Sequence, residues 1–167
     1  YKRAIEKGSV NAMYNLAILY MQEFKDLDAA IQCYKMAIDK DSADVGARAM
    51  NGLAWLYYSI NKNKAESLPL IKKSHTISST LESSHTLATI LLWHDHFQQS
   101  VETIKETILN DQLNDYMDNM TEYFLLLLSK KQYHLALELF NEFETLKNQF
   151  KPAYYALMTL LKDEYPK

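Results

Sequence analysis

Apolar residues recur along this chain at the spacing of one turn of an α-helix. Within residues 10–21 they fall at Leu16, Ala17 and Tyr20. The following segment has a stripe at positions i, i+3, i+4 and i+7, formed by Ala30, Cys33, Tyr34 and Ala37. Such spacing places the apolar side chains on one face of a helix. Short polar stretches at residues 23–26, 61–63, 95–96 and 129–132 separate such helices. The pattern predicts an all-helical chain of about nine or ten helices.

The helices repeat as pairs. Residues 12–20 align with residues 49–57 at a spacing of 37, with six of nine positions identical. The same frame recurs at Leu87, Ala88 and Leu91, then more weakly at Tyr123, Phe124 and Leu127, and finally at Ala153, Leu157 and Leu161. The later second helices carry stripes at Leu68, Ile71 and His75, at Val101, Ile104 and Ile108, and at Ala136, Phe140 and Phe143. A period of 33–37 residues is typical of stacked helical pairs. One domain is expected over 1–167, with the end of a preceding repeat at 1–8, repeats at 9–43, 44–80, 81–112 and 113–150, and a terminal half repeat at 151–167.

Residues 26–37, with the sequence DLDAAIQCYKMA, resemble the second-helix signature of Sel-one-like repeats, which are relatives of tetratricopeptide repeats. Residues 11–20 resemble the first helix of that unit, and residues 133–140 are similar to tetratricopeptide repeats. The resemblance implies an α-solenoid of antiparallel pairs in a right-handed superhelix, acting as an interaction scaffold without chemistry of its own. Residues 1–8 resemble the tail of a second helix, which implies further repeats upstream. The chain departs from the family at residues 21–25, where the usual glycine is absent.

Composition narrows the function classes. Only 3 Gly and 3 Pro occur in 167 residues, which disfavours β-sandwiches and glycine-loop nucleotide sites. The net charge of −3 lacks the basic excess of nucleic-acid-binding proteins. The longest apolar stretch, residues 86–93, is far shorter than the roughly 20 residues that span a bilayer. Cys33 is the single cysteine, which excludes an internal disulfide and favours a reducing compartment such as the cytoplasm. We therefore expect no nucleic acid and no membrane insertion.

Candidate chemistry is sparse. Trp93, His94, Asp95 and His96 form the most metal-like run, but residues two apart on a helix point away from each other. Cys33 lies on an apolar stripe, where a buried small hydrophobe is expected rather than a nucleophile. No phosphate-binding loop or hydrolase motif occurs. We predict no catalytic residue, no metal and no cofactor, with helix N-caps at Asp26 and Asp44 and a helix starting near Pro152.

In the family that the chain resembles, first helices line a concave groove. The residues expected on that face are Asn11, Tyr14, Asn15, Arg48, Asn51, Trp55, Tyr58 and His85, with Trp93 and Tyr155 as further first-helix aromatics. Asn side chains suit peptide amides, Arg suits carboxylates, and large aromatics are common interface anchors. The other interpretation is that these residues contact a neighbouring repeat.

Two functions follow. The first is a scaffold that binds a protein or peptide on the concave face. The second is a structural or self-assembling segment whose groove is filled by its own chain or by another copy. Between Glu82 and Glu122 there are eight acidic residues and one lysine, Lys105. These acids either solvate one face or steer a basic partner towards it.

Overall fold

A computed structural model describes residues 8–41, 43–110, 117–143, 146, 148 and 151–164. Their helices are α2 (Val10–Leu19), a π-helical turn η1 (Tyr20–Phe24), α3 (Leu27–Lys40), α4 (Asp44–Ser59), α5 (Lys64–Ile77), α6 (Leu81–Trp93), α7 (Phe97–Asn110), α8 (Met117–Ser129), α9 (Tyr133–Glu142) and α11 (Lys151–Glu164). No strand occurs in this part of the chain. The all-helical prediction is confirmed.

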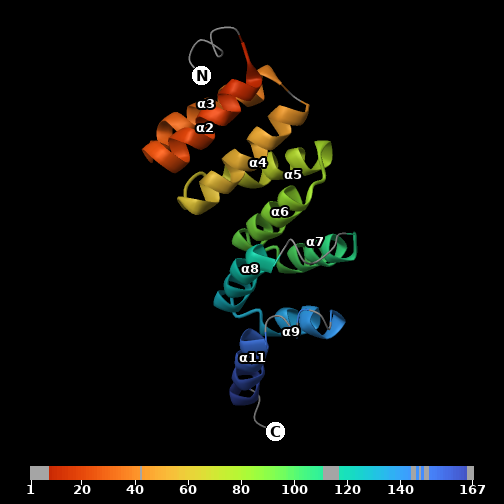
Figure 1. Cartoon of the computed structure of the whole chain (residues 1–167). Coiled ribbons are helices and arrows are strands. Elements are labelled where there is room, and N and C mark those ends of the chain that lie inside the picture. The colour runs from red at the N-terminus through yellow and green to blue at the C-terminus, as the bar shows by residue number, and fades with distance from the viewer. Residues whose placement is uncertain are drawn as a thin grey trace.

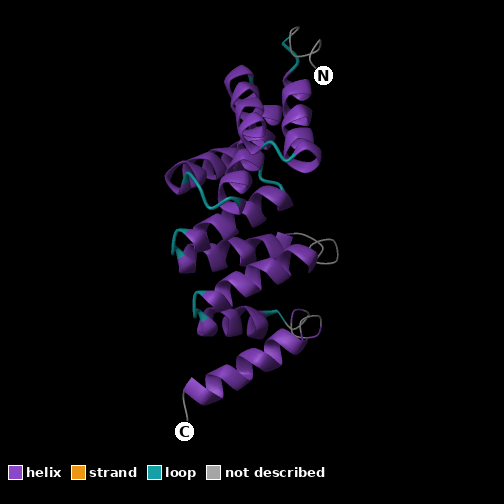
Figure 2. Ribbon diagram, turned by 90° about the vertical axis from the view of Figure 1, so that its left-hand side faces the viewer, coloured by secondary structure: helices purple, strands orange, loops and turns teal. Residues whose placement is uncertain are grey.

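Consecutive helices pack as antiparallel pairs, and the pairs stack from the N-terminus to the C-terminus (Figures 1 and 2). The pairs α2–α3, α4–α5, α6–α7 and α8–α9 each make direct contacts. First helices also touch the next first helix, because α2 contacts α4, α4 contacts α6 and α6 contacts α8. Side chains about one repeat apart in sequence are thereby brought side by side. This is the arrangement of a helical solenoid.

The core consists of three apolar clusters, which lie along the stack. Ala17, Ala54, Ala88 and Ala136 are all fully buried, as expected where helix backbones approach closely. Cys33 lies in the first cluster with only 8% of its surface exposed, so its predicted burial is confirmed. Among the described residues, no helix is both long and apolar enough to cross a membrane.

The turns within the pairs use a left-handed residue in place of glycine. Lys25, Asn61, Asp95 and Lys131 have φ of 55°, 50°, 63° and 57°. In the turns at Asn61, Asp95 and Lys131, the N–H of the left-handed residue donates to the carbonyl three residues before it. The N–H of the residue that follows donates to the carbonyl five residues before itself. This is the Schellman arrangement, which satisfies carbonyls at the end of a helix. Residues 21–25 contain no glycine, and Lys25 adopts the left-handed conformation that glycine favours at such a turn.

Two predictions about helix ends need correction. The first helix continues beyond Met21 as the π-helical turn, which ends at Phe24. The N-terminus of α4 is held by Asp41 rather than Asp44, because the Asp41 carboxylate accepts hydrogen bonds from the N–H groups of Ala43, Val45 and Gly46 at 2.8–3.1 Å. The third prediction, Asp26, is confirmed, since its carboxylate accepts from the Ala29 N–H at 3.0 Å.

The buried face of α5 also differs from the predicted stripe. Leu68 and His75 are only half-buried, whereas Ser67, Ile71 and Ser74 are buried. Ser74 Oγ donates to the Ala47 carbonyl of α4 at 2.7 Å, so a small polar side chain is satisfied inside the helix pair. Apolar periodicity alone misses such a face because the contact depends on small size and a hydrogen bond. The later stripes fit better: Val101, Ile104, Ile108, Ala136 and Phe140 are buried, and Phe143 is half-buried.

Candidate partner-binding face

The first helices α2 and α4 bring together residues that lie 37 positions apart. Arg48 Nη2 donates to Asn11 Oδ1 at 3.4 Å, and the Arg48 guanidinium lies 4.9 Å from the centre of the Tyr14 ring. Tyr14 in turn packs at 6.1 Å against Tyr34 of α3. The polar end of the predicted groove is therefore one connected cluster.

Aromatic rings continue this surface across α4 and α6. The Trp55 ring centre lies 5.3 Å from that of Tyr58 and 5.8 Å from that of His85. Tyr58 contacts Trp93 at 5.6 Å, and the Lys64 ammonium lies 5.5 Å from the Trp93 ring centre. Trp55 and Trp93 therefore pack on other rings and lie outside the three apolar clusters.

We call this surface the first-helix face. It comprises Asn11, Tyr14, Asn15, Arg48, Asn51, Trp55, Tyr58, Glu82, His85 and Trp93. Asn11, Asn15, Arg48 and Glu82 are exposed, and Tyr14, Asn51, Trp55, Tyr58 and Trp93 are half-buried. His85 differs from the rest because only 5% of its surface is exposed. It supports the Trp55 ring and does not offer a free surface.

Two adjoining hollows open on the first-helix face. One has a volume of about 290 Å³ and is lined by Asn51, Trp55, Glu82, His85 and Thr86. The other, of about 70 Å³, shares Asn51 and Glu82 with it and reaches Tyr14 and Arg48. Glu82 is absent from the residues predicted for this face. The repeat frame contains the signal, since Glu82 follows Arg48 by 34 residues, the spacing of the second and third repeats.

Burial raises the pKa of both tyrosines of this face, and neighbouring charges add to or oppose that rise. For Tyr14, burial raises the pKa, Arg48 lowers it and Glu82 raises it. For Tyr58, burial is again the main cause, and the Glu122 carboxylate beside the hydroxyl adds to it. Both phenols are therefore neutral hydrogen-bonding groups near neutral pH.

The run from Trp93 to His96 is not helical throughout, so one expectation about it is wrong. Because Asp95 is left-handed, the rings of His94 and His96 do not point apart but lie stacked, with centres 6.3 Å apart. Asp95 pairs with Lys130 at 2.6 Å, and His94 Nε2 lies 3.2 Å from Ser67 Oγ. Burial is the main cause that lowers the His94 pKa. Within the described ranges, no three His, Cys, Asp or Glu side chains are grouped to hold a metal.

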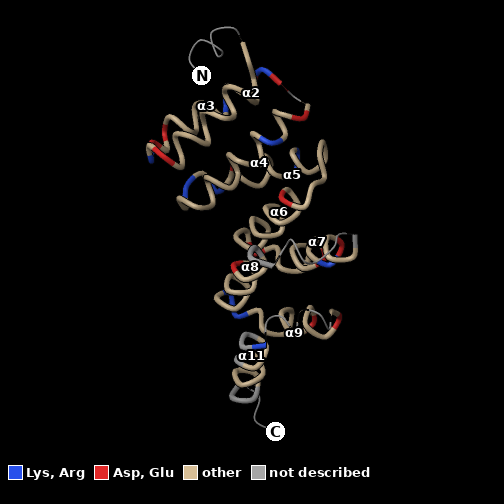
Figure 3. The backbone as a smooth tube through the Cα atoms, viewed as in Figure 1, with Lys and Arg blue, Asp and Glu red and all other residues tan. Residues whose placement is uncertain are grey.

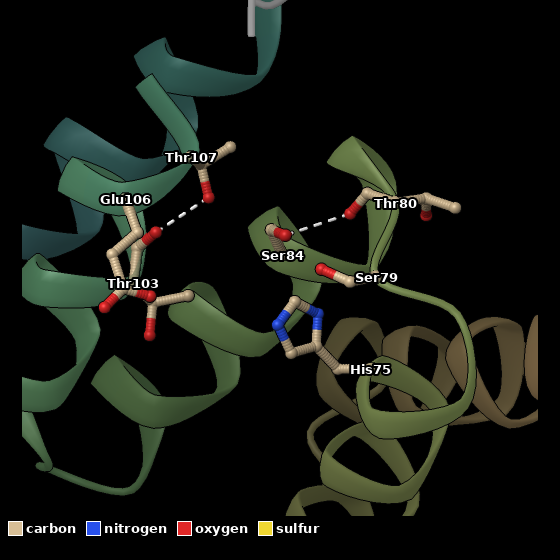
Figure 4. A pocket seen from close by; sticks show the side chains of 7 residues that line it. All are labelled: His75, Ser79, Thr80, Ser84, Thr103, Glu106 and Thr107. Carbon is tan, nitrogen blue, oxygen red and sulfur yellow. Dashed lines mark hydrogen bonds between the residues drawn. The ribbon is translucent and has the colours of Figure 1, made fainter. Parts of the chain in front are cut away.

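A separate polar hollow of about 130 Å³ lies between the α5–α6 loop and α7 (Figure 4). Its hydroxyls are engaged locally, since Ser84 donates to the Thr80 carbonyl at 2.9 Å and Thr107 to the Thr103 carbonyl at 2.7 Å. His75, which lines this hollow, has its Nδ1 3.2 Å from the Oγ of Ser83, a spacing that a nucleophile and its base can have. Ser83 is buried, however, and its hydroxyl also lies within hydrogen-bond distance of two backbone carbonyls. The pair is structural.

A solved structure has a similar fold over 98% of this chain. PilF of Pseudomonas aeruginosa, from a structure titled as its functional characterisation, superposes with a TM-score of 0.63 over 98% of this chain and 79% of that chain, at 19% sequence identity. PilF is a tetratricopeptide-repeat protein. The fold is tetratricopeptide-like. No family model matches the sequence, and no curated protein matches it.

Proposed function

We propose that this chain is a non-catalytic scaffold that binds a protein or peptide along the first-helix face. The observation that carries the proposal is that the half-buried indoles of Trp55 and Trp93, which both contact the ring of Tyr58, lie outside the apolar clusters. Large apolar rings at a surface are costly to leave in water and are common interface anchors. Exposed Asn11, Asn15 and Arg48 belong to the same first-helix face and supply hydrogen-bonding groups for a peptide backbone.

The proposed binding site has one structural competitor. An apolar hollow of about 500 Å³ lies between α3 and α5, lined in part by Ile38, Leu53, Pro69 and Leu70. It lacks the aromatic anchors of the first-helix face. The two sites can be separated experimentally because each has an exposed residue, Asn15 of α2 on the first-helix face and Asp39 of α3 in the lining of the apolar hollow.

Site-specific photo-crosslinking tests the proposal. A photoreactive phenylalanine analogue is placed at Asn15 or at Asp39, and the adducts formed in the native host are identified by mass spectrometry. We expect one recurrent protein adduct from Asn15, reduced by an added Trp55→Ala change, and none from Asp39. Adducts only from Asp39 would contradict the proposal. Adducts of the chain with itself from Asn15 would favour the self-assembling alternative.

A further inference from the structure

We infer that the hollow between α4 and α6 receives an arginine side chain of the partner. The inference rests on the proposed function and specifies the chemistry of the ligand. The volume of this hollow, about 290 Å³, lies at the lower end of the range for ligand pockets. A hollow of this size fits one long side chain better than a folded element. It is lined by one carboxylate, one indole, one amide, one imidazole and one hydroxyl, from Glu82, Trp55, Asn51, His85 and Thr86.

The carboxylate supplies the charge complementarity. Glu82 is exposed, and none of the ion pairs formed within the described residues includes it. The guanidinium of Arg48 is engaged elsewhere, over Tyr14 and with Asn11, although its residue borders the adjoining hollow. Glu82 is thus available for a cation from outside. Red bands on α6, α7 and α8 in Figure 3 show that acidic residues extend beyond it along the stack.

The second requirement of a guanidinium site is an aromatic surface. Trp55 is half-buried and is held in place by Tyr58 at 5.3 Å and His85 at 5.8 Å, so its ring is preorganised. Indole is the strongest side-chain partner for a cation stacked on its face. A guanidinium can stack on a ring and donate two hydrogen bonds to one carboxylate, which an ammonium cannot match.

Asn51 adds an acceptor at the wall of the hollow. Its Oδ1 is buried and accepts no hydrogen bond from the described part of the chain. A buried acceptor without a donor is unfavourable, and a small shift on binding would satisfy it with a guanidinium N–H. Carboxylate, indole and amide oxygen together favour a ligand that is cationic, planar and rich in donors. The arginine side chain has all three properties.

The test uses three short blocked peptides of the form Gly-Xaa-Gly, in which Xaa is arginine, its neutral isostere citrulline, or glutamate. The indole N–H resonances of the two tryptophans are followed by NMR, and Trp93→Phe assigns the remaining signal to Trp55. We expect a saturable shift of the Trp55 signal with the arginine peptide only. Glu82→Gln should weaken that affinity about tenfold or more. Glu102→Gln, an equal change of charge on α7, should change it less than about twofold.

Three results would overturn the inference: equal binding of the citrulline peptide, an unchanged affinity in Glu82→Gln, or a shift with the glutamate peptide alone. The last result would assign the face to carboxylates, with Arg48 as the recognising residue. Circular dichroism of Glu82→Gln shows whether the variant is folded. A partner crosslinked at Asn15 together with no arginine binding would leave the proposed function intact and reject only this inference.

Discussion

Gly46 provides a stringent test of the structure because its replacement by alanine should destabilise the protein, although the same replacement usually stabilises a helix. Within a helix, Gly→Ala normally stabilises by about 0.5–1 kcal/mol. At Gly46, a new Cβ would lie 1.7 Å from the Asp41 carbonyl oxygen and 2.7 Å from its carbonyl carbon. A carbon and an oxygen normally approach no closer than about 3.3 Å. The backbone of Asp41 or the start of α4 must therefore move.

The obstructing atoms belong to backbone and not to a flexible side chain. They also belong to the residue whose carboxylate holds the N–H groups of Ala43, Val45 and Gly46. Relief of the clash must therefore disturb the cap. Overpacking in a tight site costs about 1–3 kcal/mol, so Gly46→Ala should lower the free energy of unfolding by about that amount. Urea unfolding followed by circular dichroism measures it. A variant as stable as the parent, or more stable, would refute the placement of the Asp41 carbonyl against Gly46.

Gly52, in the same helix, offers a graded comparison. A Cβ there would lie 2.8 Å from the ring of Tyr34, which is buried but is a side chain. Gly52→Ala should also destabilise, and the loss should shrink when Tyr34 is changed to leucine in the same chain. A double-mutant cycle reports that coupling. Additive effects of the two changes would show that Tyr34 does not pack against Gly52.

Three further outcomes are expected. Burial is the main cause that lowers the His75 pKa, and Glu106 opposes it. As the pH drops, His75 is therefore protonated in the unfolded chain before it is protonated in the folded chain. The free energy of unfolding should then fall below about pH 6.5. The fall in melting temperature between pH 7.5 and 5.5 should be smaller in His75→Gln but unchanged in His134→Gln, an exposed control; equal falls in both variants would reject this cause. Burial also raises the pKa of the Cys33 thiol, so a thiol reagent should label Cys33 at least about tenfold more slowly in the native protein than in urea. Equal labelling rates would place Cys33 outside the core. Added zinc should leave the melting temperature unchanged. A saturable rise in melting temperature that is lost in the double variant His94→Ala, His96→Ala would instead reveal a zinc site.

The sequence predicted those features that depend on local spacing. The alanines at positions 17, 54 and 88 mark close helix contacts because their frame repeats, and each is buried. Asp26 could be predicted as a cap because it immediately precedes an amphipathic run. Asp41 could not, because its carboxylate reaches across a turn whose path depends on how two pairs stack. Ser74 was missed for a related reason, since its burial depends on a hydrogen bond to the preceding helix.

The candidate face was predicted in part. The repeat frame correctly brought Asn11 and Arg48 together, although 37 residues separate them. It did not show that His85 would be covered, because every residue of α6 from Ser83 to Leu92 is buried, whereas α4 keeps partly exposed positions along its length. The number of acidic residues between Glu82 and Glu122 does not single out Glu82 as a member of the face. Its place in the repeat is the informative property.

The most direct test of the central claim compares binding with stability in three variants. The partner captured through Asn15 is titrated calorimetrically against Trp55→Ala, Arg48→Ala and Leu53→Ala, and the free energy of unfolding is measured for each. The account predicts that the first two lose binding by about 30-fold or more while remaining folded, since interface anchors cost about 2 kcal/mol or more. Leu53, which is 1% exposed, should instead lose about 2–5 kcal/mol of stability and bind normally where folded. A Trp55→Ala protein that is destabilised like Leu53→Ala, yet binds its partner with unchanged affinity, would contradict the account.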